Sequence, residues 1–347
     1  MIMEIREGLC YDDVLLVPQY SEIVSRSDVD ISVKLGKLTF KHPIVPANMQ
    51  TVTGQEMAIQ VARSGGLAIL HRFTSPSQQF AIAEDIIDDW GSRHFAVSVG
   101  VKSEDSGNLY EFYNVGVRIF CVDIAHGNSA HCVRMIQEIR QLVDVTIIAG
   151  NVATGDGARR LWEAGADIVK VGVGPGSLCT TRIETGNGVP QLTALMDVQK
   201  TQQFLLERDR ATRYPNEQRQ YPFIADGGIK SVGDVVKALC FADMVMIGNL
   251  FAGCQEAPGQ THYINNVPHK EYLGSSTHKT NHVEGVCAWV PCTGNYETVL
   301  TKLLEGLRSG MSYQGVNSLS ELKDNPTFIR ITNAGLKESH PHDVITK

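Results

Sequence analysis

The stretch from Ile168 to Gln191 reads I-V-K-V-G-V-G-P-G-S-L-C-T-T-R-I-E-T-G-N-G-V-P-Q. It begins as an apolar run, which predicts a buried strand, and it breaks at Gly174-Pro175-Gly176, where neither a strand nor a regular helix can continue. Cys179 follows, with hydroxyl side chains on both sides. A thiol in a glycine-rich loop at the carboxyl end of a strand can act as a nucleophile, whereas most free cysteines only fill space. We therefore predict that Cys179 is a covalent nucleophile.

The composition is that of an ordinary globular protein, with 347 residues, 43% hydrophobic and 20% charged. The formal net charge of -7 and the lack of a basic block argue against nucleic acid or a membrane surface as partner. The eight cysteines form no C-x-x-C pair and no secretory signal is evident, so we expect reduced thiols in a cytoplasmic protein. No apolar run reaches the roughly 18 residues of a membrane-spanning helix.

One pattern repeats along the chain, a short β-branched run followed by a segment of helical periodicity. The eight expected strands lie at residues 43–47, 67–71, 94–99, 117–123, 145–149, 168–173, 223–226 and 244–247. The expected helices lie at residues 54–63, 75–88, 129–142, 155–164, 192–208 and 232–240. Eight strands alternating with helices predict a (β/α)8 TIM barrel. A doubly wound open sheet is the alternative, disfavoured because no G-x-G-x-x-G opens a helix after the first strand.

We expect one domain over residues 1–347, with three additions to the barrel. Residues 1–40 alternate in polarity and predict an N-terminal hairpin or lid. Residues 252–292 are rich in glycine, proline and polar side chains, which predicts a flap after the eighth strand. Residues 295–309 resume a helical pattern, and we expect the partly polar tail, 315–347, to dock on a neighbouring subunit.

Small and polar residues stand where almost every expected strand ends, and in a barrel these positions share one face. Two of these ends, Asp226-Gly227-Gly228 and Gly248-Asn249, resemble a phosphate-binding cup, because glycine turns and helix starts present backbone N–H groups. A carboxylate at Asp226 has two acceptor oxygens for ribose hydroxyls, and Ser177 adds a hydroxyl. Together they predict a nucleoside monophosphate across the barrel mouth.

These residues resemble the IMP dehydrogenase/GMP reductase family, whose G-P-G-S-x-C-T-T-R signature is matched from Gly174 to Arg182 and whose likeness runs almost the whole chain. The resemblance implies a (β/α)8 barrel, a homotetramer, and attack of the cysteine on C2 of a purine. One branch oxidises IMP to XMP with NAD and water. The other deaminates GMP to IMP and ammonia with NADPH.

Four features favour the reductase branch. Residues 72–93 leave no room for the CBS pair that most dehydrogenases insert there, and residues 275–284 lack the dehydrogenase's Arg-Tyr pair. Residues 46–51 with 71–73, and residues 122–127 with 270–275, resemble a bacterial reductase type. One feature favours the dehydrogenase, because residues 328–331 and 334–343 resemble its tail. An IMP dehydrogenase with an unusual flap is therefore the first alternative, and a catalytically silent nucleotide-binding protein is the second.

The resemblance also assigns roles to individual positions. Cys179 matches the nucleophile, and Thr181 and Glu284 match the pair that handles the leaving ammonia. Substrate contacts fall on Asn48, Ser177, Asp226, Gly227, Gly228, Gly248, Asn249, Tyr272, Gly274 and Ser275. Cofactor contacts fall on Arg72, Asp123 and Ala125, with arginine where the family more often has lysine. A monovalent cation, K+, is expected on the carbonyls of Gly174, Gly176 and Cys179, completed by Glu338, Ser339 and His340 of an adjacent subunit.

Overall fold

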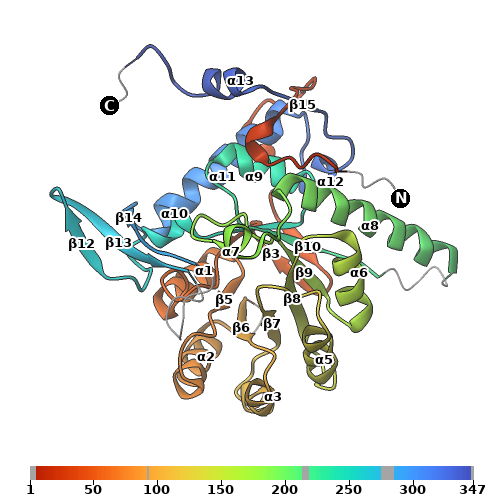
Figure 1. Ribbon diagram of the computed structural model, residues 1–347, viewed down its shortest axis with the longest axis vertical. Helices are drawn as coiled ribbons and strands as arrows, with labels where there is room; N and C mark the ends of the chain where they lie inside the picture. The colour runs from red at the N-terminus through yellow and green to blue at the C-terminus, as the bar shows by residue number, and fades with distance from the viewer. Residues whose placement is uncertain (1–4, 92–93, 213–218, 275–284, 345–347) are drawn as a thin grey trace.

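A barrel of eight parallel strands surrounded by helices forms the centre of the computed structural model, which describes residues 5–91, 94–212, 219–274 and 285–344 (Figure 1). Its strands are β4 (Ile44–Pro46), β5 (Ala68–Leu70), β6 (Phe95–Val99), β7 (Ile119–Asp123), β8 (Thr146–Val152), β9 (Ile168–Val171), β10 (Phe223–Asp226) and β11 (Met244–Ile247). They pair in the order β4-β11-β10-β9-β8-β7-β6-β5, and the two ends of this row, β4 and β5, contact each other. The predicted (β/α)8 barrel is confirmed.

Most crossovers between these strands are single helices, as the repeating pattern predicts. They are α1 (Gln55–Ser64), α2 (Pro76–Trp90), α5 (Ala130–Ile139), α6 (Gly155–Ala164), α8 (Gln191–Thr212), α9 (Val232–Leu239) and α11 (Tyr296–Tyr313). The β6–β7 crossover, for which no helix was expected, holds two short helices, α3 (Ser103–Gly107) and α4 (Leu109–Asn114). Residues 71–94, which include α2, separate β5 from β6, and this stretch is too short to hold an inserted CBS pair.

Helix starts follow the capping residues in the sequence. Ser75 and Ser231 form capping boxes at α2 and α9, and Ser129, Thr154 and Asn295 accept a backbone N–H at the starts of three other helices. Such caps satisfy N–H groups that have no partner within the helix.

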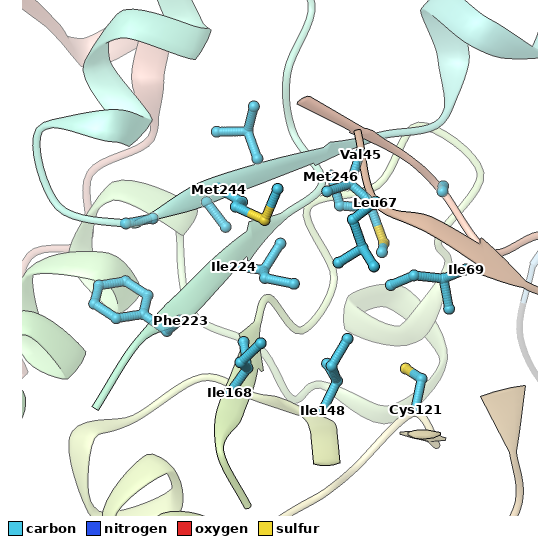
Figure 2. Packing of buried hydrophobic residues seen from close by; sticks show 14 of the residues in the cluster. Val45, Leu67, Ile69, Cys121, Ile148, Ile168, Phe223, Ile224, Met244 and Met246 are labelled. Atoms are coloured by element: carbon cyan, nitrogen blue, oxygen red, sulfur yellow. The ribbon is translucent and has the colours of Figure 1, made fainter. Parts of the chain in front are cut away.

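Buried hydrophobic side chains from several strands pack together in the barrel interior (Figure 2). Cys121, Ile168 and Ile224 are buried there, with Ile148 and Met244 beside them. Side chains two residues apart along a strand point to the same face. The residue two positions after each of the first three is Asp123, Lys170 and Asp226. The apolar layer therefore forms the floor beneath a set of charged groups.

The chain ends lie outside the barrel. Strand β1 (Val14–Leu16), preceded by the 3-10 turn η1 (Tyr11–Asp13), pairs antiparallel with β15 (Phe328–Arg330) of the tail. A hairpin of β2 (Val33–Leu35) and β3 (Leu38–Phe40) follows the turn η2 (Arg26–Asp28). The tail also holds the short helices α12 (Leu319–Leu322) and α13 (Asn333–Glu338), and α13 lies at the edge of the molecule (Figure 1).

The segment after β11 is more regular than a loop. A short helix, α10 (Asn249–Ala252), leads to an antiparallel sheet of β12 (Thr261–Ile264), β13 (Val267–Leu273) and β14 (Cys287–Pro291). This sheet projects from one side of the barrel (Figure 1). The low hydrophobicity of the segment suggested an irregular flap, but an antiparallel sheet with one face in solvent needs few apolar residues.

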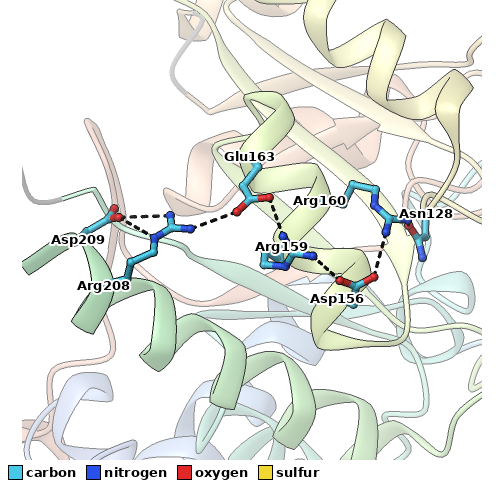
Figure 3. Close-up of polar contacts among 7 residues, drawn as sticks. All are labelled: Asn128, Asp156, Arg159, Arg160, Glu163, Arg208 and Asp209. Carbon is cyan, nitrogen blue, oxygen red and sulfur yellow. Dashed lines mark hydrogen bonds and ion pairs between the residues drawn. The ribbon is translucent and has the colours of Figure 1, made fainter. Parts of the chain in front are cut away.

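The surface of α6 and α8 carries a chain of ion pairs (Figure 3). Glu163 accepts from Arg159 at 3.0 Å and from Arg208 at 3.2 Å, and Asp156 pairs with both Arg159 and Arg160. Within the described ranges, no helix is long and apolar enough to cross a membrane.

Candidate active site

A cavity of about 330 Å³ opens at the carboxyl ends of the barrel strands. Functional pockets of barrels lie at this face, and the volume suits a small-molecule ligand. Of the predicted site residues, the following line it: Asn48, Arg72, Asp123, Ala125, Gly174, Gly176, Ser177, Cys179, Thr181, Asp226, Gly227, Tyr272 and Gly274. Residues expected from five separate strand ends, and two from the segment after the eighth strand, thus meet around one space.

The Cys179 thiol is exposed at the edge of this cavity, on the loop between β9 and α7 (Thr181–Thr185). Its Sγ donates to Thr181 Oγ1 at 3.1 Å, and its backbone N–H donates to Gly176 O at 3.0 Å. Gly174 has φ +87°, a left-handed conformation that favours glycine. The loop therefore folds back on itself and presents the thiol beside a hydroxyl.

Lys170 lies at the floor of the cavity and was not predicted as a site residue. Its Nζ is 2.8 Å from Asp123 Oδ1, 3.3 Å from Asp226 Oδ2 and 3.3 Å from Asn48 Oδ1. Burial by itself would lower the pKa of Lys170, but the two carboxylates raise it above its usual value. Burial likewise raises the pKa of Asp123, and the Lys170 ammonium outweighs it and holds that pKa below the usual value.

Asp226 is oriented by two donors on the same oxygen. Its Oδ2 accepts from Lys170 and, at 2.8 Å, from Asn151 Nδ2. Both oxygens were expected to be open to ribose hydroxyls. Since the hydrogen bonds found among the described residues fall on Oδ2, Oδ1 is the oxygen left for a ligand.

The predicted phosphate cup is partly present. Gly227 and Gly228 both have positive φ, and Gly228 packs against Pro175 of the cysteine loop. A Cβ at Gly248 would clash with the Tyr272 hydroxyl. Gly228, Gly248 and Asn249 are close to lining residues in the chain but are not among those that line the cavity.

The start of α9 contributes less to this cup than its position suggests. The backbone N–H groups of Lys230 and Ser231 both donate to Asp234 Oδ2 at 3.0 Å, inside the helix's own capping box. These donors are therefore not offered to a phosphate, and the glycine turns are the remaining candidates.

Arg72 and Asp123, the expected cofactor contacts, do not form an ion pair between their side chains. Arg72 Nε donates at 2.9 Å to the backbone carbonyl of Asp123, whereas the Asp123 carboxylate faces Lys170. The Arg72 guanidinium lies 4.7 Å from the centre of the Phe73 ring, and Phe73 also lines the cavity. The ionic partner of Asp123 thus comes from strand β9.

The part of the flap that the structure describes closes onto the cysteine loop. Gly285 N–H donates to Thr180 Oγ1 at 2.8 Å, and Val286 N–H donates to Leu178 O at 3.2 Å. Gly274 and Gly285 both line the cavity. The predicted residues Ser275 and Glu284 lie between them, outside the described residues.

The expected cation ligands are separated in this single chain. Gly174, Gly176 and Cys179 line the cavity, whereas Glu338, Ser339 and His340 are exposed around the end of α13 and do not line it. No cluster of three or more His, Cys, Asp or Glu side chains suited to a metal ion occurs among the described residues.

Sequence reasoning missed Lys170, Asn151 and Phe73. The sequence did mark Lys170, because it is the one charged residue in the otherwise apolar run at residues 168–173. Asn151 follows the expected strand 145–149, but only its hydrogen bond to Asp226 in the folded structure shows that it orients a cavity residue. No local pattern indicated that the Phe73 side chain would line the cavity.

A (β/α)8 barrel whose carboxyl-end cavity holds an exposed thiol and two aspartates joined by a lysine has the architecture of a barrel enzyme. The chain belongs to the IMP dehydrogenase/GMP reductase family, since the model of the "IMP dehydrogenase / GMP reductase domain" matches residues 8–342.

Relatives from both branches are similar to this chain. A GMP reductase of Exiguobacterium sp. is 39% identical, covering 90% of this chain and 93% of its own. A GMP reductase of Bacillus subtilis is 38% identical, covering 93% and 96%. An inosine-5'-monophosphate dehydrogenase of Aquifex aeolicus is 32% identical over 489 residues, covering 98% and 96%. The 489-residue alignment exceeds this chain's 347 residues, so that relative carries sequence that this chain lacks.

A solved structure also resembles this fold. A variant of GMP reductase from Trypanosoma brucei, crystallised in complex with guanosine 5'-monophosphate, superimposes with a TM-score of 0.87 at 28% identity. The match covers 98% of this chain and 99% of the other.

Proposed function

We propose that this protein is an NADPH-dependent GMP reductase that converts GMP to IMP and ammonia through a covalent bond between Cys179 and purine C2. The observation that carries the proposal is the 3.1 Å hydrogen bond from the exposed Cys179 thiol to Thr181 Oγ1 inside the barrel-mouth cavity. A nucleophile beside a proton-accepting hydroxyl suits attack on an electrophilic ring carbon.

The reaction balances in two steps. Cys179 Sγ bonds to C2, the C2–N2 bond breaks, and the thiol proton leaves with the amino group as ammonia. A hydride is then added to C2 and the C2–S bond breaks, which releases IMP. A proton from solvent restores the Cys179 thiol. NADPH supplies that hydride when bound.

Neither cation in the cavity suits the role of proton donor to the leaving ammonia. A guanidinium such as that of Arg72 is a poor general acid, because it does not readily give up a proton. The Lys170 ammonium is held in its charged form by Asp123 and Asp226, which raise its pKa. The Thr181 hydroxyl is therefore the described group best placed for proton transfer, and we propose Glu284 as its partner on the basis of the sequence.

The cofactor side of the cavity fits a nicotinamide. Phe73 offers a flat apolar ring and Arg72 a positive charge, and both line the same cavity as Cys179. Apolar walls with a few charged groups are typical of a site for an aromatic ring that carries phosphates. We propose that Arg72, Asp123 and Ala125 hold this end of the cofactor.

IMP dehydrogenase is the second candidate, favoured by the tail around Glu338-Ser339-His340 and by relatives of that name. The higher identity to GMP reductases and the missing Arg-Tyr pair in residues 275–284 support the reductase.

Absorbance in the reduced-nicotinamide band distinguishes the candidates. With purified protein we expect loss of signal with GMP and NADPH, and no gain with IMP and NAD. A gain with IMP and NAD would instead identify a dehydrogenase, and no change with either pair, despite GMP binding, would identify a silent binder.

We also propose a K+-dependent homotetramer in the cytoplasm. The exposed residues around the end of α13 are available to a neighbouring subunit, and all eight cysteines are free thiols, in keeping with a reducing compartment. Mass photometry in K+ and in Na+ buffers tests the assembly.

A further inference from the structure

Lys170 is an anomaly in its strand. Its neighbours Ile168, Val169 and Val171 are apolar and buried, and the Lys170 side chain itself is only 2% exposed. A buried ammonium is costly unless charged and polar partners surround it. Its partners therefore indicate why a barrel strand carries a lysine at this point.

The ammonium group has three protons, and three acceptors surround it. They are Asp123 Oδ1 at 2.8 Å from β7, Asp226 Oδ2 at 3.3 Å from β10, and Asn48 Oδ1 at 3.3 Å from the loop after β4. Since lysine has three donors and no acceptor, none remains for a ligand. Although Lys170 lines the cavity, its donors are all engaged, so it is placed to act through the residues that it holds.

The two carboxylates that it joins stand on opposite sides of the proposed chemistry. Asp226 belongs to the proposed ribose contact, and Asp123 belongs to the proposed cofactor contact beside Arg72. The Lys170 contact on Asp226 Oδ2, shared with Asn151, leaves Oδ1 as the acceptor for a ligand. One cation thus fixes groups in both halves of the cavity.

We propose that Lys170 is a positioning residue that sets the Asp226 carboxylate to recognise the ribose hydroxyls of the nucleotide while it holds the Asp123 carboxylate at the cofactor side. This inference rests on the proposed function. If Lys170 has this role, its charge should control how strongly the site prefers nucleotides that carry ribose hydroxyls over nucleotides that lack them.

A matched set of variants separates this role from simple loss of a buried lysine. Lys170→Met removes the charge and keeps the length, and Lys170→Arg keeps the charge. Lys237→Met is the control, because Lys237 is also mostly buried, 3.8 Å from Asp234 Oδ1, and does not line the cavity. The double variant Lys170→Met/Asp123→Asn also removes one of the two carboxylate charges that Lys170→Met leaves unpaired. Because fewer buried charges are then unpaired, the double variant provides a folded test protein if Lys170→Met alone does not fold.

The readout is the ratio of dissociation constants for 2′,3′-dideoxy-GMP and GMP, measured by calorimetry. In the wild type we expect the dissociation constant of 2′,3′-dideoxy-GMP to be about tenfold or more above that of GMP. This is the typical effect of losing a hydrogen bond to a charged group. The ratio should fall to within about twofold of unity in Lys170→Met and in the double variant. It should stay near the wild-type ratio in Lys170→Arg and Lys237→Met.

The pH profile gives a second readout that a purely structural role would not change. The charged or titratable groups of this cluster and its surroundings are Lys170, Asp123, Asp226, Cys121, Cys132, Arg72, Tyr272 and Tyr11. Without the ammonium, burial raises the pKa of Asp123, so the acid limb of kcat/KM should move to higher pH in Lys170→Met and not in Lys170→Arg.

Folded Lys170→Met or double variants that keep the wild-type ratio would overturn this inference alone. A wild type that binds no GMP would overturn the proposed function as well. A wild type that binds GMP, with discrimination lost only in the variants that lack the Lys170 charge, would establish the positioning role.

Discussion

Cysteine environment separates the proposed nucleophile from the other thiols. Cys121 and Cys240 are buried, which raises the pKa of each thiol to about 12, so neither is reactive at neutral pH. Cys179 and Cys287 are both exposed, but Cys179 alone of the two lines the cavity. Reactivity should therefore follow position in the cavity and not exposure alone.

Cys179→Ala should abolish turnover of GMP, by at least about a thousandfold, because no covalent bond to C2 can form. GMP binding should stay within a few-fold of the wild type, since the ribose and phosphate contacts remain. Steady-state kinetics and calorimetry check the two halves of this prediction. Cys287→Ala, on strand β14, is the control and should keep wild-type turnover; residual turnover in Cys179→Ala would contradict the covalent route.

His42 should make the fold sensitive to acid. Burial lowers the pKa of His42 from 6.5 to about 4. Between pH 4 and pH 6.5 the unfolded chain therefore binds a proton at His42, whereas the folded chain does not. Its stabilising contribution is present above about pH 6.5 and is lost as the pH falls toward 4, at about 1.4 kcal/mol per pH unit. Urea unfolding from pH 7 to 5 should show a shallower slope for His42→Gln than for wild type. The exposed control His131→Gln should keep the wild-type slope.

At the residue scale, the sequence indicated several residues that line the cavity, but not the residues that orient them. Cys179, Thr181 and Asp226 were predicted at the site, because a loop signature and strand ends mark them. Lys170 and Asn151 were not predicted as site residues. Each donates a hydrogen bond to Asp226 on another strand, and such contacts between distant parts of the sequence leave no local pattern. Pattern reasoning indicates which residues end a strand but not which neighbours orient them.

At the scale of elements, helices α9 and α11 show how small residues set close packing. A Cβ added at Gly306 would clash with Val232, and one at Gly310 would lie 2.5 Å from Val236 Cγ2. The two glycines are four residues apart and so face the same neighbour. These positions allow the last helix of the barrel to approach α9 closely.

Gly306→Ala should lower the free energy of unfolding by about 1–3 kcal/mol, because overpacking outweighs the better helix propensity of alanine. Gly233→Ala, in α9, is the matched control, since its Cβ would find only Ser231 Oγ, at 3.6 Å. That variant should be stabilised by about 0.5–1 kcal/mol. Urea unfolding measures both; equal effects of the same sign would contradict the packing argument.

The same scale shows where sequence patterns lose information. The barrel strands were predicted because each is a continuous apolar run, as expected for strands buried on both faces. The sheet β12–β14 was expected to be a loop, because its outer residues such as Tyr263 and Trp289 are exposed and mixed with polar ones. The pairing of β1 with β15 joins residues more than 300 positions apart, which no local pattern indicates.

At the scale of the whole molecule, burial decides what an ion pair contributes. Glu163 holds two arginines on the surface in Figure 3, with about two-fifths of its side chain exposed, whereas Lys170 holds two aspartates in the interior. Glu163→Gln should change the free energy of unfolding by less than about 1 kcal/mol. Lys170→Met should lower it by about 3–5 kcal/mol, because two buried carboxylates lose their cation. Urea unfolding of both variants checks the contrast, and similar losses would contradict it.

The central claim is that reduced nicotinamide is consumed only as Cys179 removes the amino group of GMP. The most direct test measures NADPH oxidation and ammonia release together in a single reaction of the wild type with GMP. We predict one ammonia released for each NADPH oxidised in the wild type, and neither NADPH oxidation nor ammonia release in Cys179→Ala. NADPH oxidation without ammonia, or ammonia release that continues in Cys179→Ala, would contradict it.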